Sequence, residues 1–246
     1  MAQKHGMSNN RTKIKEAIIL AGGLGTRIRS LFPDIPKCMV PVAGRPFLDY
    51  LLLKLKSQGF SKIILSVGFK KEYIQSYYGK KFDELTISYS EEVEPLGTGG
   101  AIKQALQYCN QECCLVLNGD SYLDFNIKEF FLRINFTRLN ILTVMVGDRS
   151  RYGAFLIDDI SGEISFEKGV PGPGYINAGV YILNRDLFDD IDESSFSFEY
   201  KILSKGINTQ NCNLIYSNYD FIDIGTPEDF QRSDSFIKSL GQINFK

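Results

Sequence analysis

Histidine is almost missing from this chain of 246 residues, because its one histidine is His5. The chain beyond residue 15 therefore offers no imidazole for a Ser-His-Asp or Cys-His catalytic pair. It also offers no imidazole ligand for zinc, copper or non-haem iron. Enzyme classes that depend on imidazole chemistry are thus excluded.

The chain also lacks an excess of charge of either sign. It has 28 Lys and Arg against 29 Asp and Glu, and its pI is about 6.0. This balance removes the broad electrostatic footprint of a nucleic-acid-binding protein, although a few local cations can still hold a small anion. No apolar run approaches the roughly 20 residues of a membrane span, and residues 1–15 contain no apolar core of a signal peptide. We expect neither nucleic acid nor membrane as a partner.

Cysteines are few, odd in number and never spaced as C-x-x-C. They are Cys38, Cys109, Cys113, Cys114 and Cys212. This pattern predicts reduced thiols in a cytoplasmic protein. Cys113 and Cys114 open an apolar run, so we expect them to be buried as small hydrophobic side chains.

The remaining composition is that of a globular protein, with 43% hydrophobic and 23% charged residues. The length fits one large α/β domain, which we place at residues 16–246 after a polar leader at 1–15. Met7 offers an alternative translation start within that leader. The sequence leaves the oligomeric state open.

Strand and helix patterns alternate through the first half. We expect strands at 16–21, 62–67, 86–89 and 113–117, and helices at 46–57, 71–78, 98–108 and 126–137. This alternation predicts an open, mostly parallel central sheet flanked by helices, which is an α/β fold. In the helix at 71–78, the helical spacing of Tyr73, Tyr77 and Tyr78 favours core packing.

The second half contains mainly strand patterns joined by short turns. We expect strands at 142–146, 153–157, 163–166, 176–183 and 214–217. They predict antiparallel additions that widen the sheet and cover one edge. Pro227 begins a last helix, for which Thr226 is the expected N-cap.

A glycine-rich turn, Gly22-Gly-Leu-Gly25, follows the first strand. Backbone N–H groups in such a turn can surround a phosphate, although the turn alone is weak evidence. The Walker A pattern G-x-x-x-x-G-K-[ST] does not fit it. A dinucleotide fingerprint fails too, because Ile28 replaces the third glycine and the second strand ends at Ser66-Val-Gly68 without an acidic residue.

The wider motif around this turn carries a resemblance. The run Leu20 to Arg27, then Pro36-Lys37, then Pro41 to Pro46 resembles the signature of the sugar-1-phosphate nucleotidyltransferases. Members of that family join a nucleoside triphosphate to a sugar 1-phosphate and release pyrophosphate. The resemblance implies their Rossmann-like nucleotide-diphospho-sugar transferase fold. Cys38 departs from the proline usual after Pro-Lys, and we expect it not to touch the chemistry.

The resemblance extends from about residue 16 to residue 230. Pro95 to Ala101 resembles the second nucleotide loop, and Asn118-Gly-Asp120 resembles the metal-binding strand end. Phe166 to Lys168 and Asn177 to Gly179 resemble sugar-facing segments, and Phe221 to Thr226 resembles the place of a second metal carboxylate. We do not expect the C-terminal left-handed β-helix domain of some relatives.

Other segments are similar to one branch of the family, the D-glycero-α-D-manno-heptose 1-phosphate guanylyltransferases. They are Pro41 to Leu52, Glu167 to Gly174, Ser197-Phe-Glu199 and Asp223 to Asp229. This branch makes GDP-heptose for bacterial surface polysaccharides, including capsules. A mannose-1-phosphate guanylyltransferase or another sugar-1-phosphate nucleotidyltransferase stays open as an alternative. A non-enzymatic relative that binds nucleotide sugars and regulates a partner is a further alternative.

The implied reaction needs cations more than a base. A sugar 1-phosphate has a second pKa of about 6, so its oxygen is already anionic at neutral pH. Positioning and charge neutralisation dominate such transfers. By the resemblance, Arg27 binds the β- and γ-phosphates. Lys37 stabilises the charge that develops between the α-phosphate and the sugar phosphate.

Two carboxylates, Asp120 and Asp223, are the expected metal ligands. They come from distant segments and have no cysteine or histidine beside them. Such a pair suits Mg²⁺, with Mn²⁺ as a substitute, because magnesium takes one or two carboxylates and completes its shell with water and phosphate. We interpret Asp124 and Asp148 as cap or turn residues.

The resemblance also assigns the contacts of both substrates. The nucleotide-binding set is Leu20, Ala21, Gly22, Gly23, Gly25, Thr26, Glu92, Glu94, Pro95, Gly97 and Thr98. The sugar-binding set is Asn118, Gly119, Glu167, Lys168, Asn177 and Gly179. Guanine presents two adjacent donors that one carboxylate can accept. We therefore expect Glu92 or Glu94 to read the base and to favour GTP.

Overall fold

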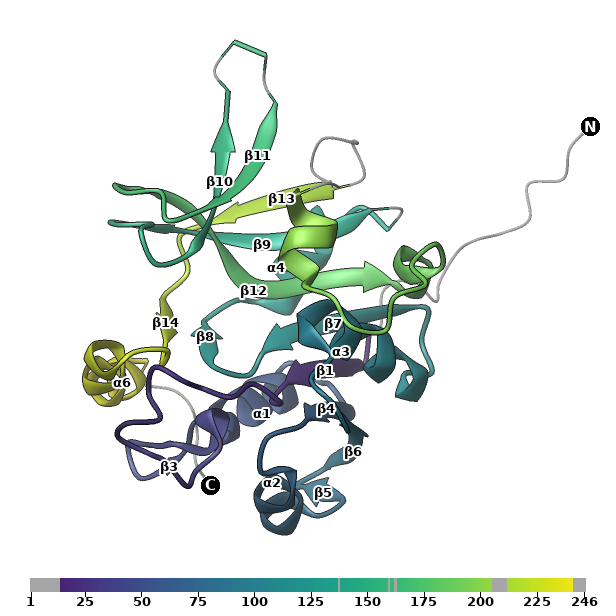
Figure 1. Ribbon diagram of the computed structural model, residues 1–246, viewed down its shortest axis with the longest axis vertical. Helices are drawn as coiled ribbons and strands as arrows, with labels where there is room; N and C mark the ends of the chain where they lie inside the picture. The colour runs from purple at the N-terminus through teal and green to yellow at the C-terminus, as the bar shows by residue number, and fades with distance from the viewer. Residues whose placement is uncertain (1–13, 137, 159, 162, 205–211, 241–246) are drawn as a thin grey trace, which may run out of the picture.

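The computed structural model describes residues 14–136, 138–158, 160–161, 163–204 and 212–240. A mixed sheet runs through the middle of the molecule in the order β11-β10-β12-β7-β1-β4-β6-β5, and β9 joins it by pairing with β12 and β13 (Figure 1). The first-half strands are β1 (Glu16–Leu20), β4 (Lys62–Val67), β5 (Lys81–Phe82), β6 (Leu85–Glu91) and β7 (Cys113–Asn118). The second-half strands are β9 (Leu139–Val146), β10 (Gly153–Ile157), β11 (Ile164–Lys168), β12 (Gly174–Asn184) and β13 (Cys212–Ser217).

The parallel part of the sheet forms from the apolar runs of the first half. β1 lies between β4 and β7 and is parallel to both. In this register Leu20 lies opposite Ser66 on one side and Asn118 on the other. The carboxyl ends of three strands therefore meet at one edge, which is where ligands bind in open α/β sheets.

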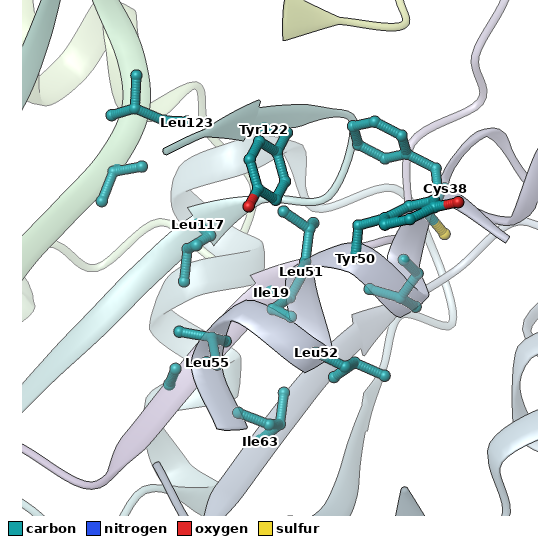
Figure 2. Close-up of a cluster of buried hydrophobic side chains, with 14 of the residues drawn as sticks. Ile19, Cys38, Tyr50, Leu51, Leu52, Leu55, Ile63, Leu117, Tyr122 and Leu123 are labelled. Carbon is teal, nitrogen blue, oxygen red and sulfur yellow. The ribbon is translucent and has the colours of Figure 1, made fainter. Parts of the chain in front are cut away.

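Helices cover the faces of the sheet. They are α1 (Phe47–Ser57), α2 (Lys71–Tyr78), α3 (Gly97–Ala105), α4 (Ile127–Arg133) and α6 (Pro227–Ser239), with α3 continued by the 3-10 turn η2 (Leu106–Tyr108). The apolar stripe of α1 packs on the sheet, as Figure 2 shows for Leu51, Leu52, Leu55, Ile19, Ile63 and Leu117. Each fully buried leucine contributes about 1.5–3 kcal/mol through the hydrophobic effect. This burial fixes the strands whose ends form the site.

The expected architecture of a mixed, mostly parallel sheet with flanking helices is confirmed. The strand at 62–67 and the helix at 71–78 have the expected bounds, and the Thr226 side chain caps α6 by accepting a hydrogen bond from the backbone N–H of Asp229. The helix expected to reach residue 137 ends at Arg133. It ends early because Ile134 has an extended backbone. The next backbone N–H, that of Asn135, donates to the Asn140 side chain at 2.7 Å instead of continuing the helix.

Two other expectations were wrong in part. β13 runs parallel to β9, although the second half was expected to add antiparallel strands. Of the three tyrosines on α2, only Tyr78 is buried, and its hydroxyl donates to Asp49; Tyr73 and Tyr77 are 45% and 54% exposed. They face outward because they lie one helical turn apart on the side of α2 away from the core.

All five cysteines are free thiols. Cys114 is completely buried, as expected, whereas Cys113 is only partly buried. Among the described residues, no helix is long and apolar enough to cross a membrane.

Candidate active site

A pocket of about 540 Å³ opens at the carboxyl ends of β1, β4 and β7. Its volume lies within the usual range for small-molecule sites, about 300–1,000 Å³. It is lined by Leu20, Ala21, Gly22, Gly23, Leu24, Lys37, Cys38, Gly68, Phe69, Glu92, Val93, Glu94, Pro95, Gly97, Thr98, Ala101, Asn118, Gly119 and Asp120. Most of the expected nucleotide-binding residues are therefore brought together around one cavity.

The glycines of the first loop are required by close contacts. A Cβ atom on Gly22 would lie 2.4 Å from Oε1 of Glu92. Gly25 has a φ of +58°, and a Cβ atom there would lie 3.0 Å from Cβ of Lys37. Because glycine has no Cβ and tolerates positive φ, the loop can pass directly over both side chains.

Lys37 is the cation that the structure places inside the pocket. It begins the 3-10 turn η1 (Lys37–Met39), and its Nζ donates to Oδ2 of Asp120 at 2.6 Å. Its side chain is only 12% exposed. The enclosing loops reduce its hydration, which strengthens its attraction for anions.

Cys38 lies beside this lysine and is buried. Burial, with the nearby charge of Asp120, raises the pKa of the Cys38 thiol to about 12. The thiol is therefore neutral at physiological pH and cannot serve as a thiolate nucleophile. It forms an apolar part of the pocket wall.

Two short strands bring the second carboxylate to the first. β8 (Ser121–Leu123) pairs antiparallel with β14 (Phe221–Asp223), with Asp223 opposite Ser121. The backbone N–H of Ile224 donates to the carbonyl of Asp120 at 2.9 Å. Burial, together with the charge of Asp120, raises the pKa of Asp223.

The two carboxylates fit a hard divalent cation. They supply oxygen ligands in a partly desolvated place, and like charges held together favour a bound cation. Within the described ranges no cluster of three His, Cys, Asp or Glu side chains forms a metal cage. A metal held by Asp120 and Asp223 would take its other ligands from water and phosphate, which is the habit of magnesium.

An arginine that the sequence did not single out supports Asp223. The Arg151 guanidinium lies 3.8 Å from Oδ2 of Asp223 and forms an ion pair with Asp229, whose side chain is only 3% exposed. The Thr226 hydroxyl also donates to Asp229, at 2.9 Å. This network joins the loop before β10 to the start of α6 behind the candidate metal site.

The two glutamates expected near the base differ in their surroundings. Glu92 is half-buried, and its carboxylate accepts from the backbone N–H of Leu96 at 3.1 Å and from the Ser66 hydroxyl at 3.4 Å. Burial raises the pKa of Glu92. Glu94 is exposed at the edge of the pocket.

The polar end of the first loop lies outside the pocket lining. Thr26 and Arg27 are exposed and do not belong to the lining residues. The Arg29 guanidinium lies over the ring of Phe69, 4.7 Å from its centroid. Phe69 itself lines the pocket, so Arg29 lies near the mouth of the pocket.

A bulge in β12 places the expected sugar-facing residues beside the end of β7. The register shifts between Asn177 and Val180, and Gly179 has a φ of +72°. A Cβ atom on Gly179 would lie 2.4 Å from Nδ2 of Asn118. The Asn177 side chain accepts from the N–H of Gly179 at 3.0 Å and donates to the Tyr181 hydroxyl at 2.6 Å.

The remaining sugar-facing candidates lie at the end of β11. Glu167 and Lys168 are both exposed. Lys168 forms an ion pair with Glu199, the first residue of the π-helical turn η4 (Glu199–Leu203). Glu167, Lys168, Asn177 and Gly179 do not line the 540 Å³ pocket. In the sequence, the motif Ser197-Phe-Glu199 contributed only to the family resemblance and did not predict the ion pair between Lys168 and Glu199.

The two turn aspartates have different environments. Asp148 is a turn residue, as expected, because it accepts from the backbone N–H groups of Ser150 and Gly172. Asp124 instead forms an ion pair with Lys54 of α1.

Comparison with known proteins gives a consistent result. The model of the nucleotidyl transferase family matches residues 16–239. D-glycero-alpha-D-manno-heptose 1-phosphate guanylyltransferase of Campylobacter jejuni is 42% identical over 219 residues, which are 87% of this chain and 96% of that protein. The enzyme of the same name from Aneurinibacillus thermoaerophilus is 40% identical over 222 residues, 89% of this chain and 96% of that protein.

Solved structures show the same similarity. The crystal structure of HddC from Yersinia pseudotuberculosis has a TM-score of 0.81 and 40% identity, and it covers 91% of this chain and 100% of HddC. HddC complexed with GMP-PN has a TM-score of 0.80 at the same identity and coverage.

Proposed function

The chain belongs to the nucleotidyl transferase family, and from that premise we propose that it is a sugar-1-phosphate guanylyltransferase. It transfers GMP from GTP to D-glycero-α-D-manno-heptose 1-phosphate and releases pyrophosphate. Its relatives from Campylobacter jejuni and Aneurinibacillus thermoaerophilus carry that activity in their names. The GDP-heptose formed serves surface polysaccharide synthesis in the cytoplasm, a location that five free thiols support.

The convergence of Lys37, Asp120 and Asp223 at the edge of the pocket carries this proposal. A lysine that is 12% exposed and a pair of carboxylates can neutralise and orient several phosphate groups at once. The reaction joins two anions, so its barrier is lowered chiefly by such charges. We expect a regulatory relative without activity to have lost this set.

The chemistry proceeds without a general base. A phosphate oxygen of the sugar 1-phosphate attacks the α-phosphorus of GTP, and the bond from that phosphorus to the bridging oxygen of pyrophosphate breaks. The attacking oxygen is anionic above about pH 6. In this proposal Lys37, which lines the pocket, binds the α-phosphate and the attacking phosphate together. Arg27, on the exposed end of the loop, holds the β- and γ-phosphates.

Magnesium is the metal we propose for Asp120 and Asp223, with manganese as a substitute. When bound, it supplies positive charge to the phosphates of GTP. Neighbouring groups hold the Asp223 carboxylate in position. It accepts a hydrogen bond from the backbone N–H of Gly225 at 2.5 Å, and the Arg151 guanidinium lies 3.8 Å from its other oxygen.

Glu92 is the side chain we propose for reading guanine. Its carboxylate touches Gly22 in the pocket wall and is partly desolvated. A desolvated acceptor gains from the N1–H and N2–H donors of guanine and discriminates against bases that lack them. Glu94 is more exposed and is the alternative.

We propose that the sugar 1-phosphate binds between the end of β7 and β11. Asn118 and Gly119 lie in the pocket lining, and Gly179 contacts Asn118. Asn177, Glu167 and Lys168 extend this side beyond the pocket. Mannose 1-phosphate is the alternative substrate, because the hydroxyl groups of both sugars would meet the same side chains.

One substrate matrix tests the proposal. Pyrophosphate release is measured with Mg²⁺ for GTP, ATP, CTP and UTP against the 1-phosphates of heptose, mannose and glucose. We expect the highest kcat/KM for GTP with heptose 1-phosphate. Faster turnover with mannose 1-phosphate would replace the substrate assignment, and no turnover with any pair would overturn the enzymatic function.

A further inference from the structure

Residues 194–199 form a strap that lies along the second nucleotide loop, residues 95–100. The backbone N–H of Phe196 donates to the carbonyl of Leu96 at 2.9 Å, and the carbonyl of Phe196 accepts from the N–H of Gly99 at 2.9 Å. The backbone N–H of Phe198 donates to the Thr98 hydroxyl, also at 2.9 Å. The strap and the loop, about 100 positions apart in the sequence, are thus joined by hydrogen bonds at Leu96, Thr98 and Gly99.

The close approach of the strap requires glycine at three positions of this loop. A Cβ atom on Gly97 would lie 2.7 Å from the carbonyl oxygen of Phe196, and one on Gly100 would lie 2.1 Å from that of Ser194. A Cβ atom on Gly99 would lie 2.2 Å from the Phe196 ring. The absence of Cβ atoms lets the two backbones meet, so the loop and the strap pack directly against each other.

The strap ends at Glu199, which reaches a different part of the site. Its carboxylate forms an ion pair with Lys168 at the end of β11. The Glu199 side chain is 28% exposed and that of Lys168 is 66% exposed. Glu199 begins η4, and π-helical turns occur frequently at functional sites.

The strap also packs against β12, because the ring of Phe198 lies 5.1 Å from the ring of Tyr181. Burial raises the pKa of the Tyr181 hydroxyl, the hydrogen bond from Asn177 lowers it, and the charges of Glu199 and Asp120 raise it further. The same hydroxyl accepts a hydrogen bond from Asn177. The residue before Glu199 therefore packs beside the bulge of β12, where the sugar 1-phosphate is proposed to bind.

We propose that Glu199 is a positioning residue that orients Lys168 toward the sugar 1-phosphate, and that the strap fixes Glu199 relative to the nucleotide loop. This inference rests on the proposed function, in which Lys168 contacts the sugar phosphate. A lysine on a four-carbon stem loses much rotamer freedom when it binds an anion. A carboxylate at the end of a hydrogen-bonded strap restricts the lysine beforehand, so less freedom is lost on binding.

Glu199→Gln tests the inference, and Glu193→Gln is its matched control. Glu193 forms an ion pair with Lys201 in the same segment, so its variant removes the same kind of charge without touching Lys168. For Glu199→Gln we expect kcat/KM for the sugar 1-phosphate to fall about 10-fold, a loss of transition-state binding. The KM for GTP should not change, Glu199→Asp should recover part of the loss, and Glu193→Gln should behave as the wild type.

A double-mutant cycle with Lys168→Met separates positioning from unrelated damage. If Glu199 acts through Lys168, the double variant should be no worse than Lys168→Met alone. Additive losses, an equal rise in the KM for GTP, or tighter sugar 1-phosphate binding by Glu199→Gln would each overturn the inference. The wild type is assayed first: its failure to release pyrophosphate would overturn the proposed function and this inference together, whereas an active wild type with additive variants overturns this inference alone.

Discussion

Lys37 and Asp120 lie 83 positions apart in the sequence, yet their charged groups are separated by 2.6 Å. Lys37 is set by the turn after the glycine loop, and Asp120 by the end of β7. Asp223 joins them through the pairing of β14 with β8. Three distant segments thus place one cation and two carboxylates at the edge of a nucleotide-sized pocket.

Lys37→Met is expected to lower kcat/KM by about 10²–10⁴, the effect of removing one electrostatic stabiliser. The reason is that Lys37 is the buried cation of the pocket. Steady-state pyrophosphate release measures the loss. Lys56→Met is the control, because Lys56 pairs with Asp83 and Glu84 outside the pocket. Near wild-type turnover of Lys37→Met would contradict its assigned role.

Arg27→Ala is expected to lower kcat/KM by about 10²–10⁴ if its guanidinium stabilises the leaving pyrophosphate. Arg27 is exposed, so its removal should leave the unfolding temperature unchanged. Arg29→Ala is the comparison, since Arg29 packs on Phe69. A larger kinetic loss in Arg29→Ala than in Arg27→Ala would move the assignment to Arg29.

Chelation by EDTA is expected to abolish activity, and Mg²⁺ or Mn²⁺ should restore it. Asp120→Asn and Asp223→Asn should both lose metal-dependent turnover, because each removes an anionic oxygen ligand. Binding of Mn²⁺ followed by electron paramagnetic resonance gives a second measurement that needs no turnover. Restoration by zinc but not by magnesium would show that the hard-cation assignment is wrong.

Asp223→Asn is also expected to stabilise the metal-free fold at pH 7–8. Burial raises the pKa of Asp223 in the folded state above its pKa in the unfolded chain. The ionised carboxylate therefore destabilises the fold, and this cost appears as the pH rises from the unfolded-state pKa through the folded-state pKa. The advantage of the variant should therefore shrink as the pH falls toward 4. Thermal unfolding in EDTA measures it.

Asp148→Asn is the control for this pH dependence, because the pKa of Asp148 is shifted in the opposite direction to that of Asp223. Hydrogen bonds from Ser150 and Gly172 lower the pKa of Asp148, so its ionised form is favoured in the fold. This variant should gain no stability at neutral pH. A wild type that is more stable than Asp223→Asn at pH 8 in EDTA would contradict the expected cost of the buried charge.

Glu92→Gln is expected to weaken GTP use by about 10–100-fold, the scale of a charged hydrogen bond. A glutamine offers one acceptor oxygen where guanine presents two donors. The readout is kcat/KM for GTP, with Glu94→Gln as the matched control in the same loop. A larger loss in Glu94→Gln would transfer base reading to Glu94, and equal use of GTP and dTTP by the wild type would refute the base assignment.

The local elements could be predicted from the sequence because their signals are local. The apolar run of β1, the glycine turn after it and the alternation of strands and helices follow from burial and backbone freedom over a few residues. The long motif around Arg27 and Lys37 identified the family, and the match over residues 16–239 confirms it. Asp120 and Asp223 were singled out for the same reason.

Tertiary structure alone decided how these residues meet. β8 and β14 have three residues each, too few to show a strand period, yet their pairing brings Asp223 to Asp120. The bulge of β12 brings Gly179 against Asn118, and an ion pair joins Lys168 to Glu199. In each case the sequences of the two segments show no sign of the contact. Burial of Lys37 and exposure of Tyr77 depend on which neighbours pack above them, and packing between distant segments is a property of the folded chain.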